Sequence, residues 1–235
     1  MKTLLTFLLI LTSTITFGQE IKFKIKGQKD TTVNLVRYFG KGLYYADTAE
    51  VKNGIIKFDG SKQKYGILAL FLPGQKMLEF IYNGEDIHIE ADKADLMGTT
   101  VVKTSEENKI FSKYIAYMAT ERTKANAWVE ERKLEKVDSD KHTDLTVKIE
   151  KTSLNVENYQ LNLIENNPDK LVSKIVRMSM EVKIPEAPVD ESGVITDSNF
   201  RFNYYRNHFF DNVDLTDDRL VRTPIYHNKL STYFS

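Results

Sequence analysis

The chain has 235 residues with 33 basic and 33 acidic side chains, so its formal net charge is zero. This balance, without a run of like charges, excludes the broad basic surface that nucleic-acid binding requires. The absence of cysteine excludes disulfides and thiolate catalysis, and we expect no lipoprotein anchor, which needs a cysteine at the start of the mature chain. The length suffices for one large or two small domains.

The N-terminal residues have the features of a secretory signal peptide. A lysine gives a positive start, residues 4–11 are apolar, and Thr16 and Gly18 are the small residues expected just before a cleavage site. We therefore expect removal of residues 1–18, a mature chain that begins at Gln19, and export to the periplasm or beyond. No later segment has the ~20 apolar residues of a membrane helix, so we expect no membrane span.

Residues 19–98 are predicted to form an antiparallel β domain. Apolar and charged residues alternate along residues 21–26, as in a strand with one buried face. Further strands are predicted at 32–39, 43–51, 55–59, 66–72, 76–82 and 86–90. Turn-forming pairs separate several of them: Asn53-Gly54, Pro73-Gly74 and Asn83-Gly84. Strands joined by such short turns cannot be parallel, so we expect an antiparallel sandwich or rolled sheet.

The remaining residues, 99–235, are predicted to form a helical domain, which makes the fold class α+β. A helix over residues 105–122 is expected to begin at a capping box formed by Thr104 and Glu107. The next stretch, residues 126–166, contains no Gly or Pro and is rich in Lys and Glu. It predicts one long, uninterrupted helix.

The predicted long helix carries a narrow apolar seam with steps of four and three residues. The seam consists of Leu145, Ile149, Thr152, Val156, Tyr159 and Leu163. Pro168 predicts the start of another helix, residues 181–198 a loop, and Thr223 followed by Pro224 a last helix. Because this helix is apolar as far as Phe234, we expect the chain to continue in the full-length protein and the helical domain to be truncated here.

Two parts of the chain resemble a known family. The strand region contains YYADTAEVKNGIIKFDG and LPGQKMLEFIYNGEDIHIE, and it is similar to the N-terminal β domain of exported thioredoxin-like thiol-disulfide oxidoreductases. The C-terminal region contains HFFDNVDLTDDRLVRTPIYHNKLSTYF, and it resembles the helical domain that follows in that family. The resemblance implies that a C-terminal thioredoxin-like domain of the same parent protein is the partner. This chain lacks the family's Cys-x-x-Cys pair, so the resemblance supplies no catalytic residue.

The histidines do not have the spacing of a metal site. They are His88, His142, His208 and His227. The last two lie nearer one another and could meet with Asp211, Asp214 or Asp217. Helix caps and surface contacts explain these residue types equally well. We therefore predict no metal site and no cofactor.

The remaining motifs also have structural explanations. The Gly40-Lys41-Gly42 segment lacks the spacing of a phosphate-binding loop, and Ser61 lacks the glycines of a nucleophile elbow. The acidic pairs Glu106-Glu107 and Asp217-Asp218 fit helix capping. The segment Pro185-Glu-Ala-Pro188 fits a proline-recognition motif by spacing only. We predict no catalytic residue in this chain.

An aromatic block in the helical region is the most prominent remaining feature. It consists of Tyr204, Tyr205, Phe209 and Phe210, flanked by Arg206 and Arg222. We favour packing, within the helical domain or on a missing domain, over a peptide or ligand groove. Two hypotheses remain: an accessory region that positions a thioredoxin-like domain or selects its client, and a self-contained envelope module that binds peptide or glycan. A Cys-x-x-Cys pair beyond Ser235 would favour the first.

Overall fold

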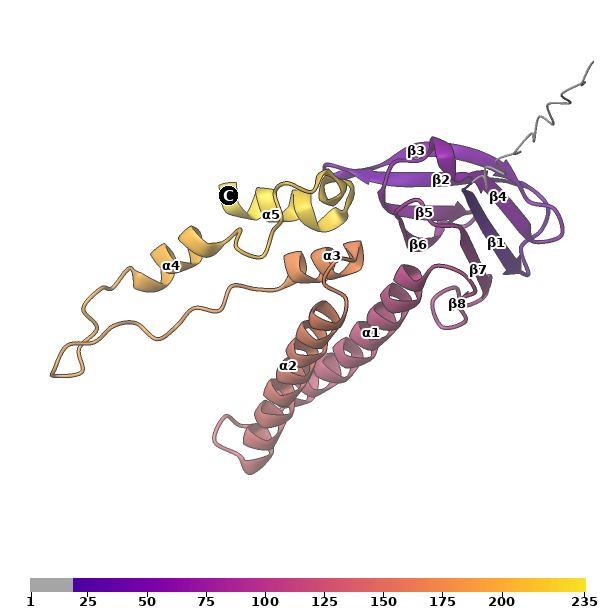
Figure 1. The fold of residues 1–235 in the computed structure, drawn as a ribbon. Coiled ribbons are helices and arrows are strands. Elements are labelled where there is room, and N and C mark those ends of the chain that lie inside the picture. Colours follow the sequence, from indigo (N-terminus) through magenta and orange to yellow (C-terminus); the bar gives the residue numbers. More distant parts are fainter. Residues whose placement is uncertain (1–18) are drawn as a thin grey trace, which may run out of the picture.

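The computed structural model describes residues 19–235, and the predicted signal peptide lies outside them. The first part consists of two four-stranded sheets packed face to face (Figure 1). The strands are β1 (Glu20–Lys26), β2 (Thr32–Phe39), β3 (Gly42–Glu50), β4 (Ile55–Asp59), β5 (Gly66–Leu72), β6 (Lys76–Tyr82), β7 (Ile87–Asp92) and β8 (Val101–Val102). One sheet has the order β4-β1-β7-β8 and the other β3-β2-β5-β6. Helices follow, which confirms the predicted α+β class.

One strand pair corrects the prediction of an antiparallel fold. β1 and β7 run parallel, with Ile21 opposite Ile87 and Lys26 opposite Asp92, whereas the other pairs between described strands are antiparallel. The short turns do fix the direction of strands that are neighbours in sequence. β1 and β7 are separated by five strands, and this intervening chain provides the crossover that a parallel pair needs.

The two predicted Asn-Gly turns connect strands that are neighbours in the chain. Asn53 and Gly54 have positive φ and join β3 to β4 through a two-residue turn, in which Lys52 and Ile55 exchange both backbone hydrogen bonds. Asn83 and Gly84 carry the chain from β6 to β7. In both places the two strands belong to different sheets, so each Asn-Gly pair turns the chain from one layer of the sandwich to the other.

The helices are α1 (Glu106–Lys133), α2 (Asp140–Asn166), α3 (Leu171–Ser179), α4 (Phe200–His208) and α5 (Pro224–Phe234), with 3-10 turns η1 (Gly60–Lys62) and η2 (Asp218–Arg222). Ser105, rather than Thr104, caps α1 by accepting a hydrogen bond from the Asn108 N–H. Thr223 caps α5, as predicted. None of the described helices combines the length and hydrophobicity that crossing a membrane requires.

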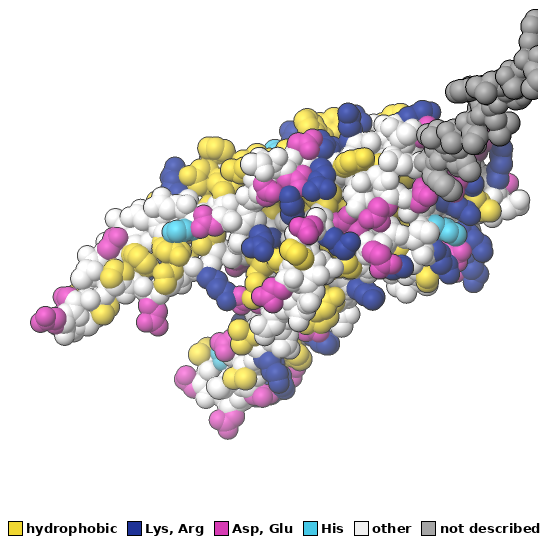
Figure 2. All heavy atoms as spheres, viewed as in Figure 1, with side chains coloured by type: hydrophobic (Ala, Val, Ile, Leu, Met, Phe, Trp, Pro, Cys, Tyr) yellow, Lys and Arg dark blue, Asp and Glu magenta, His cyan; other side chains and the backbone are white. Residues whose placement is uncertain are grey.

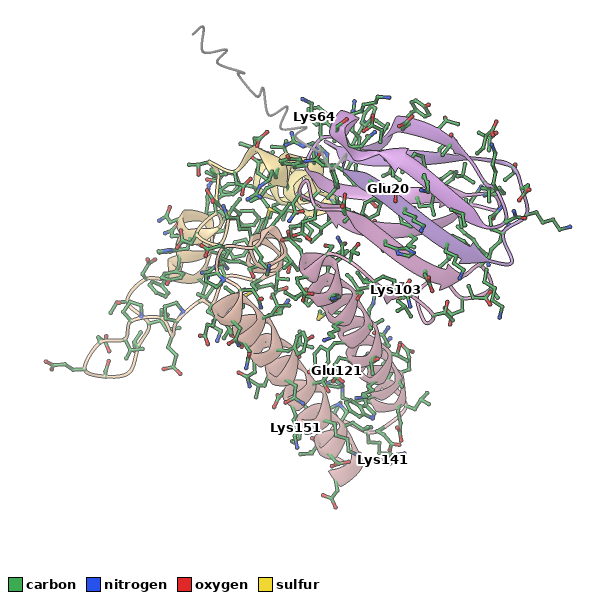
Figure 3. All side chains as sticks on the ribbon, turned by 45° about the vertical axis from the view of Figure 1, so that its right-hand side comes forward. Glu20, Lys64, Lys103, Glu121, Lys141 and Lys151 are labelled. Atoms are coloured by element: carbon green, nitrogen blue, oxygen red, sulfur yellow. The ribbon has the colours of Figure 1, made fainter. Side chains whose placement is uncertain are left out.

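The predicted long helix over residues 126–166 is wrong, because the chain reverses direction between α1 and α2. The Ser139 hydroxyl accepts a hydrogen bond from the His142 N–H and starts α2 afresh. Lys141, labelled at the far tip of the hairpin in Figure 3, pairs with Glu131 and Glu135 of the preceding chain. Local capping and charge pairing thus make a turn without Gly or Pro.

The predicted apolar seam faces α1. Its members are buried or half-buried, and Tyr159 stacks on Tyr117 of α1 with ring centroids 4.0 Å apart. Gln160 also donates a hydrogen bond to the hydroxyl of Tyr114 at 3.2 Å. The seam therefore joins two antiparallel helices side by side, and the pair projects from the sandwich (Figure 1).

Two hydrophobic cores organise the molecule. The first fills the space between the sheets and includes Phe23 and Phe80, whose rings meet edge to face at 5.3 Å. The second lies on the outer face of the β5 and β6 strands, where Ile67 and Ile81 contact residues of α1, α3 and η2. The inner face of the sheet that contains β5 and β6 contributes to the first core and its outer face to the second. The helical part is therefore packed on the β part as a third layer.

Candidate functional site

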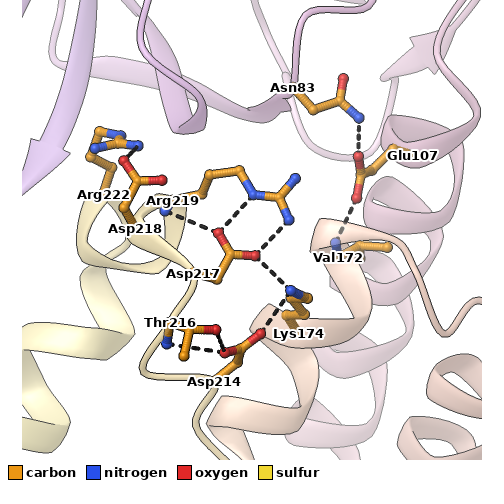
Figure 4. Close-up of polar contacts among 10 residues, drawn as sticks. All are labelled: Asn83, Glu107, Val172, Lys174, Asp214, Thr216, Asp217, Asp218, Arg219 and Arg222. Atoms are coloured by element: carbon orange, nitrogen blue, oxygen red, sulfur yellow. Dashed lines mark hydrogen bonds and ion pairs between the residues drawn. The ribbon is translucent and has the colours of Figure 1, made fainter.

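The densest cluster of charged side chains ties α3 to the segment before η2 (Figure 4). Lys174 of α3 donates to Asp214 and to Asp217, both at 2.8 Å. Asp217 also accepts hydrogen bonds from the Nε of Arg219, at 2.8 Å, and from the backbone N–H of Arg219. Each carboxylate thus has cationic or backbone partners, and the cluster holds the chain as a clamp.

The titration behaviour of the clamp fits a structural role. Hydrogen bonding to Arg219 holds the pKa of Asp217 far below its usual range, and hydrogen bonding to Lys174 lowers the pKa of Asp214 to about 2. The same acids raise the pKa of Lys174. All three groups therefore stay charged throughout the neutral range, which is the opposite of what a general acid or base needs.

Glu107 is a second buried carboxylate in this region (Figure 4). It accepts a hydrogen bond from the backbone N–H of Val172 at 2.7 Å and another from the side-chain amide of Asn83. Capping of a helix N-terminus was predicted for Glu107, but the helix it caps is α3 and not its own. This contact also explains why α3 begins at Leu171 and not at Pro168, since a carboxylate in the right place stabilises that N-terminus.

Burial raises the pKa of Glu107, against the opposing effect of the Val172 N–H. A raised carboxyl pKa in a cleft is a common sign of a functional group. Here both oxygens already have protein partners, and the side chain is almost inaccessible to solvent. Glu107 joins the strand-bearing part, α1 and α3, and it has no free oxygen to offer a substrate.

A third contact joins the two parts of the chain at Gly66. Its φ of +144° is disfavoured for other residues, and a side chain there would collide with Arg222 at 2.7 Å. Arg222 in turn donates a hydrogen bond to the Tyr65 carbonyl and pairs with Asp218. The 3-10 turn η2 is thus pressed directly against the start of β5.

The four histidines do not converge. His208 pairs with Asp211 at 2.6 Å and stacks on Tyr204, and His227 contacts Ser231 of its own helix. His88 lies on β7, and His142 lies in the first turn of α2. Across residues 19–235, no three His, Asp or Glu side chains are grouped closely enough to hold a metal ion.

The other motifs lie at surface turns. Gly40 and Gly42 form the β2–β3 turn, and the Ser61 hydroxyl is bonded to Asp59 in the turn after β4. Residues 185–188 form part of an exposed loop. Asp59 also accepts a hydrogen bond from the Ser61 N–H and pairs with Lys62, so the Ser61 contact belongs to the turn itself.

The aromatic block is partly core and partly surface. Phe209 is buried against Phe210 and Tyr233, with centroids 5.1 and 5.4 Å away. Tyr205 contacts Phe209 edge to face but remains exposed, and α4 has no fully buried residue. Packing within the helical part therefore accounts for Phe209 at the C-terminal end of the aromatic block. The ring of Tyr205 in α4 is exposed to solvent.

One lysine, Lys229, lines a hollow of about 610 Å³ between α5 and the chain that follows α3, with both polar and apolar side chains around it. The Nζ of Lys229 is 4.6 Å from the ring centroid of Phe209 and donates to the Phe209 carbonyl at 3.3 Å. Burial lowers the pKa of Lys229, partly opposed by Glu181. Contact with the aromatic ring and the carbonyl satisfies the cation without a ligand.

A larger hollow, about 960 Å³, lies on the other side of the chain that leaves α3. We call residues 180–184 the strap and this hollow the strap groove. Its floor is apolar, with Met118 from α1, Val156 from α2 and Met180 from the strap. Figure 2 shows the α1–α2 hairpin and the arm that carries α4 as separate projections with an open notch between them.

Some of the charges around the strap groove are paired within the protein. Glu121, labelled on α1 in Figure 3, pairs with Lys124 at 2.7 Å, and Glu157 of α2 pairs with Lys183 of the strap. Arg122 and Glu181 also line the groove. The groove therefore has an apolar floor and a rim that carries both positive and negative side chains. Such a surface suits an amphipathic segment of polypeptide more than a phosphate or nucleic acid.

The sequence prediction missed the strap groove and the role of Asn108 in joining the helices to β6. Asn108 of α1 is hydrogen-bonded to the backbone N–H and C=O of Ile81 in β6. Neither feature has a local sequence signal. The groove is formed by residues more than 50 positions apart, and the sequence around Asn108 shows only a polar residue near the start of a helix. The one available hint was the apolar pair Met178 and Met180 at the end of a strongly amphipathic helix.

Comparison with known proteins gives one match. A family model described as a domain of unknown function (DUF4369) matches residues 20–111, which is less than half of the chain. The matched range contains all eight strands and the first turns of α1, including Glu107 and Asn108. Searches of curated proteins and of solved structures found no match.

Proposed function

We propose that this chain is a non-catalytic accessory region of an exported thioredoxin-family protein, and that it binds a polypeptide client or the partner redox domain in the strap groove. The observation that carries the proposal is the groove itself, with its apolar floor and a rim of charged side chains of both signs. The absence of cysteine supports a non-redox role, because thiol-disulfide exchange requires a thiolate. The thioredoxin association rests on the sequence resemblance.

Binding of an unfolded client tests the groove. The probe is the fluorescein-labelled B chain of insulin with alkylated cysteines, titrated with residues 19–235 and followed by fluorescence anisotropy. Val156→Glu places a charge on the groove floor and should weaken binding at least tenfold. Leu154→Glu adds the same charge to an exposed site on α2 outside the groove and should leave binding unchanged. Equal affinities of the two variants for the probe would refute the proposal that the client binds in the strap groove.

A second candidate is a self-contained envelope module that binds peptide or glycan, and the exposed rings of α4 favour it. Phe202 is 63% exposed and Tyr205 38% exposed, and such rings commonly bind apolar faces of ligands. Titration with a soluble peptidoglycan fragment, compared between the natural chain and Phe202→Ala, separates the two functions. Binding that is lost in this variant would favour the module.

Export itself is open to a direct measurement. The chain should begin at Gln19 after secretion, because the small residues Thr16 and Gly18 precede that position. N-terminal sequencing of material from the host's envelope fraction checks this. Recovery of an intact Met1 would contradict the export that the proposal assumes.

A further inference from the structure

The strand β6 is the outer strand of its sheet, and one side chain already occupies part of its free edge. Asn108 of α1 accepts a hydrogen bond from the Ile81 N–H at 2.8 Å and donates one to the Ile81 carbonyl at 2.7 Å. This is the same pair of bonds that a residue of a neighbouring strand would make. Asn108 therefore takes the place of a strand residue at one position of the edge.

The contact with Asn108 shows which backbone groups of β6 face outward. Ile81 points its N–H and C=O away from β5, and along a strand this orientation recurs every second residue. Glu79 and Met77 must then face outward as well, opposite Ala69 and Phe71 in the ladder. Within residues 19–235, no further hydrogen bond reaches the backbone groups of Glu79 or Met77.

Met77 and Glu79 line one side of an apolar cleft of about 260 Å³. The wall opposite β6 includes Phe111 and Ile115 of α1, and Met97 lies near the end of the cleft. The cleft opens because α1 begins beside β6 and then runs away from the sandwich (Figure 1). The carboxylate of Glu79 is bonded to the Tyr38 hydroxyl, so it is held by the sheet.

We infer that the β6 edge at Met77 and Glu79 is a strand-addition site for an extended apolar peptide from another protein. The two exposed N–H and two exposed C=O groups require a partner with donors and acceptors at strand spacing, which an extended backbone supplies. The cleft would receive apolar side chains from that peptide. The site is separate from the strap groove and goes beyond the function proposed above.

A second copy of this chain fits this edge less well than a single peptide. Pairing of two β6 strands would bring a whole second sheet, together with its own α1, to an edge that α1 already flanks. A single extended segment has no such bulk. Asn108 also stops the added strand at Ile81, so we expect a short site centred on Met77 and Glu79.

The test uses the chain 19–235 and a fluorescein-labelled peptide of alternating valine and threonine. The control peptide has the same side chains but is N-methylated at every residue, which removes the backbone donors from both of its edges. We expect the first peptide to bind at least tenfold more tightly than the second. Equal binding, or no binding of either peptide at millimolar concentration, would overturn the inference.

Two variants test the protein's side of the contact. Met77→Pro removes an outward N–H without breaking the β5 ladder, as proline on an edge strand allows, and should abolish binding. Met77→Ala keeps the N–H and should weaken binding no more than about threefold. Comparable losses in the two variants would show that the side chain, and not strand pairing, is recognised.

Hydrogen exchange gives a measurement that does not depend on these variants. In the free protein the amides of Met77 and Glu79 should exchange quickly, while those of Leu78 and Phe80 are protected by β5. Peptide should then protect Met77 and Glu79. Protection of the Met77 and Glu79 amides in the free monomer would overturn the inference. A dimer of the protein that Met77→Pro dissociates would also overturn it, because the β6 edge would then be occupied by a second copy of the chain.

Discussion

At the scale of single residues, two buried acids connect the helices to the sandwich, and they respond to pH in opposite directions. Burial raises the pKa of Glu107, whereas pairing with Arg219 and Lys174 lowers that of Asp217. A carboxyl group whose native pKa is raised stabilises the fold at low pH, and this contribution is lost as the pH rises through the native pKa. One whose native pKa is lowered stabilises the fold above its unfolded pKa of about 3.9, and this contribution is lost as the pH falls through the native pKa. The two residues therefore make separable contributions.

Glu107→Leu should destabilise the fold by about 1–3 kcal/mol, because the buried N–H of Val172 loses its acceptor. Glu107→Gln keeps an acceptor and removes the buried charge. It should be at least as stable as the natural chain at pH 7, and its stability should fall less between pH 4 and pH 7. Urea unfolding followed through the single Trp128 measures both variants. A larger loss for the glutamine than for the leucine would contradict this assignment.

Asp217→Asn should destabilise the protein by about 2 kcal/mol at pH 7, because it weakens the bonds to Lys174 and Arg219. The difference from the natural chain should shrink as the pH falls through the native pKa of Asp217, where its carboxylate becomes protonated. Asp218→Asn is the matched control. That neighbour is exposed, and the change should cost no more than about 0.5 kcal/mol.

At the scale of elements, Asn108 joins a helix to a strand edge. Both backbone groups of Ile81 are buried and depend on this one side chain. Asn108→Ala should therefore cost about 2 kcal/mol or more, since two buried polar groups lose their partners. Asn108→Asp keeps the acceptor for the Ile81 N–H and should cost less at a pH where it is protonated. Chemical denaturation across pH values distinguishes the two variants.

The helices also differ in how firmly they are held. In α3, Val172 and Val176 are fully buried, whereas α5 has no fully buried residue and its Phe234 is 79% exposed. A helix of about eleven residues is marginal on its own and needs a docked face. We expect the amides of α5 to exchange by local opening, well before those of α3. Equal protection of the two helices in a monomer would contradict this expectation.

At the scale of the whole molecule, the matched family range and the packing divide the chain at different places. The family match ends at residue 111, inside α1, and β8 lies beyond residue 98, where we placed the end of the β domain. The second hydrophobic core nevertheless unites Ile81 of β6 with α1 and α3. The start of α1 thus belongs to the sandwich by contact, and the rest of α1 projects with α2.

The sequence by itself determined what is local. The bounds of β1 to β7 to within about two residues, the Asn53-Gly54 turn, the apolar seam of α2 and the Thr223 cap follow from period and capping chemistry within a few residues. The short strand β8 was not predicted. The absence of cysteine determined equally directly that no thiolate chemistry occurs in this chain. These features needed no knowledge of distant contacts.

The tertiary structure alone decided what depends on distant residues. The parallel pairing of β1 with β7, the break before Ser139, and the cap that Glu107 places on α3 each join elements without a shared local signal. The same holds for the strap groove and for the open edge of β6. A backbone group is exposed or satisfied according to which element folds beside it, and that neighbour is set by packing of the whole chain.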